Sequence, residues 1–167
     1  MLIRDATIAD AGAIASIYSH AVLTTTASFD VEPVSAEDRE RWLKARSPVH
    51  PVLVCEADGV VAGWGALSPY SERWAYAATV ELSVYVDAAF RKRGIGRSIT
   101  AALIERAESA QIHVLLARIC TENTPSIEMV RALDFAYVGT MHEVGRKFDR
   151  WLDVATWEYI VCTPDAS

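Results

Sequence analysis

The sequence has no excess of basic residues and no long hydrophobic run, and each absence excludes a class of function. Its 16 Lys and Arg residues are outnumbered by 22 Asp and Glu residues, which gives a net charge of −6. Proteins that bind duplex nucleic acid usually carry a basic excess, because neutralised phosphates supply much of the affinity. No run approaches the ~20 apolar residues of a membrane-spanning helix. We therefore expect neither nucleic acid nor membrane as a partner.

Cysteine is also scarce. Cys55, Cys120 and Cys162 are widely spaced, and none forms a CxxC pair. This spacing argues against a metal site or a redox motif, and the four histidines show no metal-ligand spacing either. The N-terminal segment MLIRDATIAD contains acidic residues and lacks the apolar core of a signal peptide. We therefore expect a cytoplasmic protein without a metal, in which Cys55 and Cys120 are small core residues.

Length and composition indicate one domain spanning residues 1–167, because 51% hydrophobic and 23% charged residues are a globular mixture.

The segment at 112–120 is almost continuously apolar, as in a strand buried on both faces. We expect the segment at 143–150 to join the last two strands. The order of elements predicts one mixed α/β domain. Apolar patterns predict strands at 2–5, 51–57, 60–67, 79–87, 112–120, 135–141 and 151–161, and helices at 8–23, from Ser35, at 98–110 and from Thr124.

The most informative segment runs from Thr79 to Ile104 as a strand, a basic turn and a helix. A helix N-terminus leaves about four N–H groups unpaired and carries a partial positive charge. Glycines let a ligand approach the backbone closely, so this turn can bind a pyrophosphate. The spacing is neither that of a Walker loop nor that of a three-glycine dinucleotide fingerprint. From the turn alone, an ordinary charged connection with helix-capping glycines fits as well. The turn consists of Arg91, Lys92, Arg93, Gly94, Ile95, Gly96 and Arg97.

The same turn, R-x-x-G-x-G after a V-x-V strand, resembles the acetyl-CoA signature of the GNAT N-acetyltransferases. ICTENTPSIEMVRALDF resembles the next segment of that family. TTTASFD, TVELSVYV and GRKFDRWLDV resemble the subfamily of phosphinothricin and methionine sulfone/sulfoximine acetyltransferases. The resemblance covers residues 2–161. It implies the GNAT fold, a mixed α/β sheet with helices on both faces, whose central strand at 79–87 carries a bulge and splays from the strand at 112–119.

The resemblance also implies where acetyl-CoA binds. Its pantetheine arm would pair with backbone groups of Val84 and Val86 in the opening between the splayed strands. The N–H groups of residues 92–97 would hold the pyrophosphate, within the basic turn described above. Asn123 and Ser126 would contact the far side of coenzyme A.

Glu81 is the candidate general base. An amine must lose a proton before it attacks a thioester, and a carboxylate in a partly dry cleft can accept that proton directly or through water. Glu81 lies inside an otherwise apolar strand, where an unpaired carboxylate is costly. The resemblance places the catalytic Glu of the subfamily at this position. The alternative is an outward-facing Glu without a chemical role.

Phe29, Arg73 and Tyr76 fall on positions that line the substrate pocket in phosphinothricin acetyltransferases. Arginine can pair with carboxylate or phosphinate oxygens through two parallel hydrogen bonds, and aromatic side chains can wall the pocket. The alternative interpretation is an exposed Arg and aromatic residues that pack a loop. Ser71 stands where some relatives have Lys, which argues against phosphinothricin itself as the substrate.

These observations predict an acetyl-CoA-dependent N-acetyltransferase that acts on the α-amine of a small amino acid or analogue. The favoured acceptors are methionine sulfone, methionine sulfoximine and phosphinothricin. Acetylation of protein N-termini or polyamines is an alternative. So is a non-catalytic acyl-CoA-binding module, because Val130 replaces a His or Tyr that relatives often have. The resemblance implies a homodimer, with Lys147, Trp151 and Asp153 near its interface.

Overall fold

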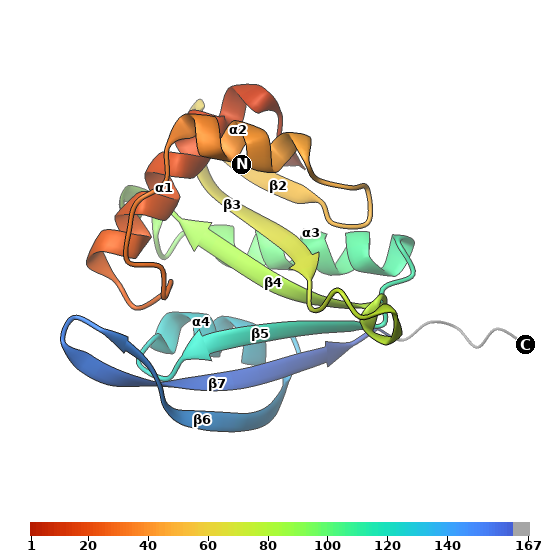
Figure 1. The fold of residues 1–167 in the computed structure, drawn as a ribbon. Coiled ribbons are helices and arrows are strands. Elements are labelled where there is room, and N and C mark those ends of the chain that lie inside the picture. The colour runs from red at the N-terminus through yellow and green to blue at the C-terminus, as the bar shows by residue number, and fades with distance from the viewer. Residues whose placement is uncertain (162–167) are drawn as a thin grey trace, which may run out of the picture.

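The structure is a computed structural model that describes residues 1–161, so Cys162 lies outside the described residues. Seven strands form one sheet in the order β1-β2-β3-β4-β5-β7-β6 (Figure 1). Only β4 and β5 pair in parallel. The strands are β1 (Leu2–Asp5), β2 (Val52–Ala57), β3 (Val60–Pro69), β4 (Thr79–Val86), β5 (Val114–Cys120), β6 (Ala136–Lys147) and β7 (Arg150–Ile160). The helices are α1 (Ala11–Thr24), α2 (Ala36–Lys44), α3 (Ile95–Ser109) and α4 (Thr124–Arg131), with single turns η1 (Ile8–Asp10), η2 (Trp74–Tyr76) and η3 (Ala88–Phe90).

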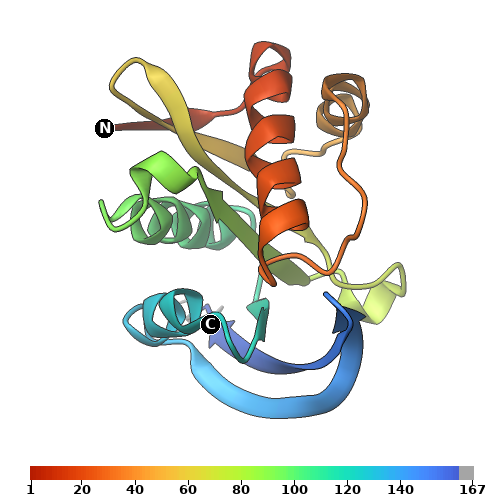
Figure 2. The ribbon, with the colours of Figure 1, turned by 90° about the vertical axis from the view of Figure 1, so that its left-hand side faces the viewer.

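Helices cover both faces of the sheet. Figure 2 shows α1 and α2 on one side and α3 and α4 on the other. Each face has its own hydrophobic cluster: Ile99 and Leu103 of α3 pack on one face, and Ile14 of α1 packs with Trp64 on the other. Side chains alternate between the faces along β4. Val80 and Leu82 therefore belong to the α3 cluster, whereas Tyr85 contacts the α1 cluster.

The centre of the sheet opens as predicted, but not through a bulge. β4 and β5 pair only from Thr79–Val114 to Glu81–Leu116, and then diverge (Figure 1). The pairing of β3 with β4 has no register shift along its whole length, so the predicted bulge in the strand at 79–87 is wrong. The opening arises because β4 stays paired with β3, while β5 stays paired with β7 through all seven residues of β5.

Three local predictions also need correction. β5 is not buried on both faces: Arg118 is exposed because one face borders the opening. The segment at 143–150 is mostly strand, since β6 continues to Lys147 and pairs with Arg150. Phe148 and Asp149 both have positive φ values and form the two-residue turn. Helix α3 begins at Ile95 rather than at residue 98, because Gly94 is its N-cap.

Both cysteines predicted to lie in the core, Cys55 and Cys120, are buried and free. Within residues 1–161, none of the helices combines the length and the apolar character that a membrane span requires.

Candidate active site

A cleft of about 410 Å³ lies where β4 and β5 diverge. It has two sides, which we name after the helices on each face of the sheet. The α3–α4 side contains the side chains that β4 directs toward α3, together with residues of α4 and its N-cap, and the α1 side contains those that β4 directs toward α1. The lining of the α1 side also includes residues 26–30 and the β6–β7 hairpin. The α3–α4 side is lined by Leu82, Val84, Asn123, Ser126, Met129 and Val130, and the α1 side by Phe29, Glu81, Tyr85, Arg118, Met141 and Val144, among others.

β4 presents a free backbone edge to the cleft. The Asp87 N–H donates to the Ala62 carbonyl at 2.9 Å, which identifies these two residues as a hydrogen-bonded pair of the β3–β4 ladder. Hydrogen-bonded and non-bonded pairs alternate in antiparallel strands. Val84 and Val86 therefore direct their N–H and C=O groups away from β3, toward the side from which β5 has diverged. An extended ligand with amide groups can pair with this edge as an added strand would.

The basic turn ends directly at the N-terminus of α3. Gly94 has φ +79°, a left-handed conformation that favours glycine, and its carbonyl accepts the first helical hydrogen bond from Ser98 at 3.0 Å. The N–H groups of Ile95, Gly96 and Arg97 precede that bond and lack intrahelical partners. A Cβ at Gly96 would lie 3.2 Å from the Met129 Sδ atom. The turn therefore brings unpaired N–H groups close to the α3–α4 side of the cleft.

The charges of the turn are exposed. Arg91, Lys92, Arg93 and Arg97 all reach solvent, and Arg93 also pairs with Asp58 of the β2–β3 turn at 2.8 Å. The helix dipole and these cations create a positive potential at the mouth of the cleft. An anionic group such as a pyrophosphate suits this place.

The predicted pair at the start of α4 also lines the cleft. Asn123 is the N-cap of α4, and its Oδ1 atom accepts a hydrogen bond from the Ser126 N–H at 3.4 Å. Val130 lies seven residues after Asn123, about two turns along the helix, and is only 1% exposed. Its aliphatic side chain contributes to the cleft wall and cannot donate a proton.

Glu81 lies in the cleft but is not unpaired. Arg118 of β5 holds it through two parallel hydrogen bonds, Nε to Oε1 at 2.9 Å and Nη2 to Oε2 at 2.8 Å. The hydrogen bonds that Arg118 donates to Glu81 raise the pKa of the Arg118 guanidinium. Arg118 was not among the residues predicted from the sequence, although it is the one Lys or Arg in the apolar run at 112–120. An arginine in an otherwise apolar strand was the signal that could have found it.

The β6–β7 hairpin anchors the loop that lines the α1 side. Lys147 is 6% exposed, and its Nζ atom donates to the carbonyls of Thr25 at 2.9 Å and Ser28 at 2.6 Å. Its burial lowers the pKa of this ammonium group. Tyr18 adds hydrogen bonds to Ser28 and Asp30. The lining of this side therefore depends on contacts between segments more than 100 residues apart.

The comparisons with known proteins agree with this geometry. The family model described as an acetyltransferase (GNAT) domain matches residues 3–156. The chain belongs to the GNAT acetyltransferase family. A relative from Salmonella typhimurium, named L-methionine sulfoximine/L-methionine sulfone acetyltransferase, is 40% identical over 92% of this chain and 91% of its own length. A phosphinothricin N-acetyltransferase from Streptomyces viridochromogenes is 34% identical over 93% and 85% of the two chains.

Solved structures show the same fold. A Salmonella typhimurium acetyltransferase structure with its cofactor acetyl-CoA has a TM-score of 0.94 at 38% identity, covering 100% of this chain and 99% of that one. A structure from Brucella melitensis named ribosomal-protein-alanine N-acetyltransferase has a TM-score of 0.93 at 41% identity, covering 96% and 99%. The predicted resemblance to the GNAT fold and to its methionine sulfoximine and phosphinothricin branch is confirmed.

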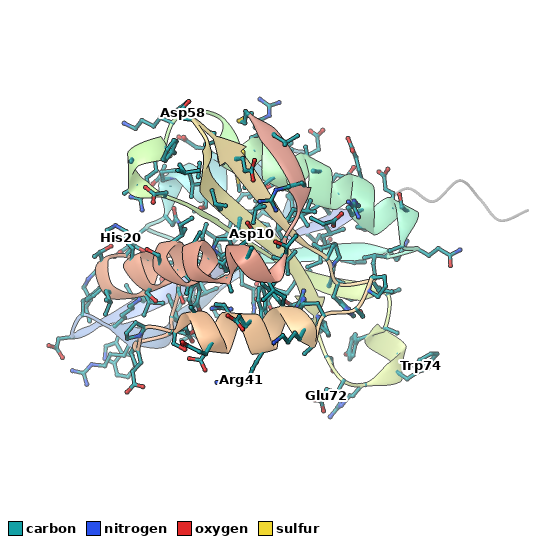
Figure 3. The ribbon with its side chains drawn as sticks, turned by 90° about the horizontal axis from the view of Figure 1, so that it is seen from above. Asp10, His20, Arg41, Asp58, Glu72 and Trp74 are labelled. Atoms are coloured by element: carbon teal, nitrogen blue, oxygen red, sulfur yellow. The ribbon has the colours of Figure 1, made fainter. Side chains whose placement is uncertain are left out.

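Not all predicted acceptor-binding residues of this GNAT domain meet in the cleft. Phe29 lines it together with Glu81, whereas Arg73 and Tyr76 do not. Both lie on the exposed loop that contains η2, where Tyr76 packs edge-on against Tyr70 with ring centroids 5.3 Å apart. Figure 3 shows Glu72 and Trp74 projecting from the same loop at the rim of the molecule. The roles of Arg73 and Tyr76 in acceptor binding stay predictions.

Within residues 1–161, no group of three or more His, Cys, Asp or Glu side chains is placed to hold a metal ion.

Proposed function

We propose that this chain is an acetyl-CoA-dependent N-acetyltransferase that acetylates the α-amine of a small amino acid or analogue. Methionine sulfone, methionine sulfoximine and phosphinothricin are the favoured acceptors. One observation carries the proposal: a single cleft has a free strand edge beside a helix N-terminus on its α3–α4 side and a carboxylate, Glu81, on its α1 side. Two substrates can thus meet from opposite faces of the sheet.

The α3–α4 side has the groups that acetyl-CoA requires. The backbone of Val84 and Val86 suits the amides of a pantetheine arm, and the first N–H groups of α3 suit a pyrophosphate. Asn123 and Ser126 lie on the opposite wall of the same side. Acetyl-CoA, when bound here, supplies an acetyl group activated as a thioester.

The α1 side has the group that an amine acceptor requires. Glu81 takes a proton from the acceptor ammonium, directly or through water, and leaves a neutral nitrogen that can attack. Arg118 keeps the carboxylate in one orientation through its two hydrogen bonds. Val130 provides no side-chain acid, so water or backbone N–H groups stabilise the departing thiolate.

Acetylation of a protein N-terminus is the second candidate, because a structure 41% identical to this chain is named a ribosomal-protein-alanine N-acetyltransferase. Polyamines are a further alternative acceptor. The non-catalytic module remains the alternative from another class, because Val130 removes a proton donor.

A thiol-release assay with acetyl-CoA separates these functions. The acceptors are methionine sulfone, methionine sulfoximine, phosphinothricin, an alanine-initiated peptide and spermidine, each at the same concentration. We expect rapid release of coenzyme A with the sulfone and the sulfoximine and slow release with the peptide and spermidine. Preference for the peptide would support the second candidate. Absence of release with every acceptor, despite calorimetric binding of acetyl-CoA, would support the non-catalytic module.

A homodimer is part of the proposal. β6 is an edge strand of the sheet, and apolar side chains on it and on its partner strand are exposed. An edge strand presents N–H and C=O groups that can pair with a second chain. Sedimentation equilibrium should give twice the mass of one chain, and a monomer at micromolar concentration would contradict the proposal. The exposed residues are Tyr137, Val138, Met141, Val144 and Trp151.

We also place the enzyme in the cytoplasm. Cys55 and Cys120 are free and buried, which suits a reducing compartment. Fractionation of cells that express the chain should recover it with cytoplasmic markers, and recovery with secreted proteins would contradict this placement.

A further inference from the structure

Arg118 is the one cation among the described residues that line the cleft. The other charged lining residues are Asp30 and Glu81, both acidic. The guanidinium lies on the α1 side, where the proposed function places the acceptor, and its side chain is 49% exposed. A ligand that enters this side can therefore reach it from solvent.

The ion pair with Glu81 leaves part of the guanidinium free. Arginine has five N–H donors, and the contact with Glu81 uses Nε and one donor of Nη2. One donor of Nη1 and the second donor of Nη2 lie along another edge of the same plane. That edge can bind a second carboxylate through two parallel hydrogen bonds.

We infer that Arg118 binds the carboxylate of the acceptor amino acid while Glu81 holds its ammonium. This inference rests on the proposed function and names its substrate class: free α-amino acids. An α-amino acid carries both charges on neighbouring atoms of one carbon, and Glu81 and Arg118 lie side by side with the complementary charges. Arg118 is then a residue that determines specificity.

The charge balance supports a zwitterion over the alternative acceptors. A bound α-amino acid adds one positive and one negative charge. Glu81, Arg118, the ammonium and the carboxylate then each lie beside a group of opposite charge. A polyamine would add only cations beside Arg118, which costs Coulomb energy in a partly dry cleft. The amine of a peptide N-terminus would arrive with a neutral amide where the carboxylate would be. Arg118 therefore favours free amino acids over both.

The test compares methionine sulfone with methionine sulfone amide, which replaces the carboxylate by a neutral carboxamide. In Arg118→Gln both acceptors lose the orientation that Arg118 gives to Glu81, but we expect the fall in kcat/KM to be at least tenfold larger for the amino acid than for the amide, with the excess mainly in KM. Arg41→Gln is the matched control, because Arg41 lies on the outer surface of α2 (Figure 3). Calorimetry should give the same Kd for acetyl-CoA in all three proteins.

Two outcomes would overturn the inference. An equal loss for both acceptors would show that Arg118 only positions Glu81. Selective loss in Arg73→Gln instead of Arg118→Gln would transfer the role to the exposed loop. If the unchanged protein releases no thiol with any amine, the proposed function fails. The role of Arg118 is then tested by calorimetric binding of methionine sulfone to the protein saturated with coenzyme A. Binding that weakens tenfold in Arg118→Gln supports the inference, and unchanged or absent binding refutes it.

Discussion

The backbone groups that the α3–α4 side offers to a ligand come from one stretch of chain, whereas the α1 side is assembled from several. Residues 79–97 provide the strand edge, the basic turn and the helix N-terminus, and side chains of β5 and α4 complete the wall. The α1 side needs residues 26–30, Arg118 of β5 and the hairpin around Gly145. In our proposal, the first side binds acetyl-CoA through backbone groups, which many different side chains would leave unchanged. The second depends on particular side chains, so its specificity can change through single substitutions.

The two sides also differ in where their charges come from and whether those charges are paired. On the α3–α4 side, positive potential comes from a helix N-terminus and exposed cations, which salt screens. On the α1 side, the charges of Glu81 and Arg118 are paired at 2.8–2.9 Å within the cleft. Substitutions on one side should therefore leave the function of the other intact, and four predictions test this separation.

The largest effect is expected for Glu81→Gln. Proton transfer by a positioned group typically contributes 10²- to 10⁴-fold, so kcat should fall by about that factor. The Kd for acetyl-CoA should stay unchanged, because Glu81 points to the α1 side. Stopped-flow thiol release and calorimetry measure the two quantities. A fall in kcat of less than threefold would remove Glu81 from the role of base.

Gly96→Asp should act on the other side. A carboxylate in the first turn of α3 would repel the pyrophosphate, so the affinity for acetyl-CoA should fall more than tenfold, about 1.4 kcal/mol. An acidic residue favours a helix N-terminus, so the loss should not come from unfolding.

Gly96→Ala is the matched control, because its Cβ meets Met129 in the same way without a charge. We expect less than a threefold change in that variant. Equal losses in both variants would show that crowding against Met129, rather than charge, explains the effect.

The difference between the two sides also explains what could be predicted from the sequence. A strand, a glycine-bearing basic turn and a helix are consecutive in the chain, so their pattern was visible as Arg91–Gly96 and the strand before it. The pairing of Val84 and Val86 with a pantetheine arm was implied by the family resemblance and not by this pattern, and the structure directs the backbone groups of both residues toward the opening. The predicted bulge was wrong, because the divergence of β5 toward β7 involves pairing between distant strands.

The α1 side was harder to predict for the same reason. The contact of Arg118 with Glu81 joins residues 37 positions apart, and that of Lys147 with Ser28 joins residues 119 apart. Spacing along the chain contains no information about such pairs. Phe29 was predicted only because the chain resembles the family. Arg73 was predicted in the same way, but it lies outside the cleft lining.

Gly145→Ala tests the long-range contacts that form the α1 side. Its expected effect, on KM for the acceptor, is smaller than that of Glu81→Gln on kcat. A Cβ at Gly145 would overlap the ring of Phe29, so the ring must move and reshape the α1 side. One extra methyl group in an apolar pocket is worth about tenfold, so KM for the acceptor should rise by roughly that factor. The Kd for acetyl-CoA should not change.

Gly139→Ala is the matched control on the same strand, because a Cβ there meets nothing within 4 Å. Steady-state kinetics should separate the two variants. If both leave KM unchanged, the Phe29 loop does not shape the acceptor site.

The smallest effect on activity is expected at Asp10, which lies away from both sides of the cleft. Its carboxylate accepts hydrogen bonds from Arg4 Nη1 and Nη2, each at 2.8 Å, and from the Thr7 N–H at 2.7 Å. The hydrogen bonds from Arg4 are the main cause that lowers the pKa of Asp10 from 3.8 to about 2. Asp10→Asn should leave kcat and both substrate affinities unchanged but lower the free energy of unfolding by about 2 kcal/mol at pH 7.

The sign of the pH dependence follows from the lowered pKa. Because the folded protein holds the ionised carboxylate, this stabilisation is complete above the unfolded pKa near 4 and disappears as the pH falls toward 2. Urea titrations at a series of pH values should therefore show the gap between the unchanged protein and Asp10→Asn closing across that window. Asp5→Asn is the control, because its exposed pair with Arg106 at 2.7 Å should contribute at most about 1 kcal/mol. A gap that persists at pH 2 would mean that packing at Asp10, and not the charge of its carboxylate, stabilises the start of α1.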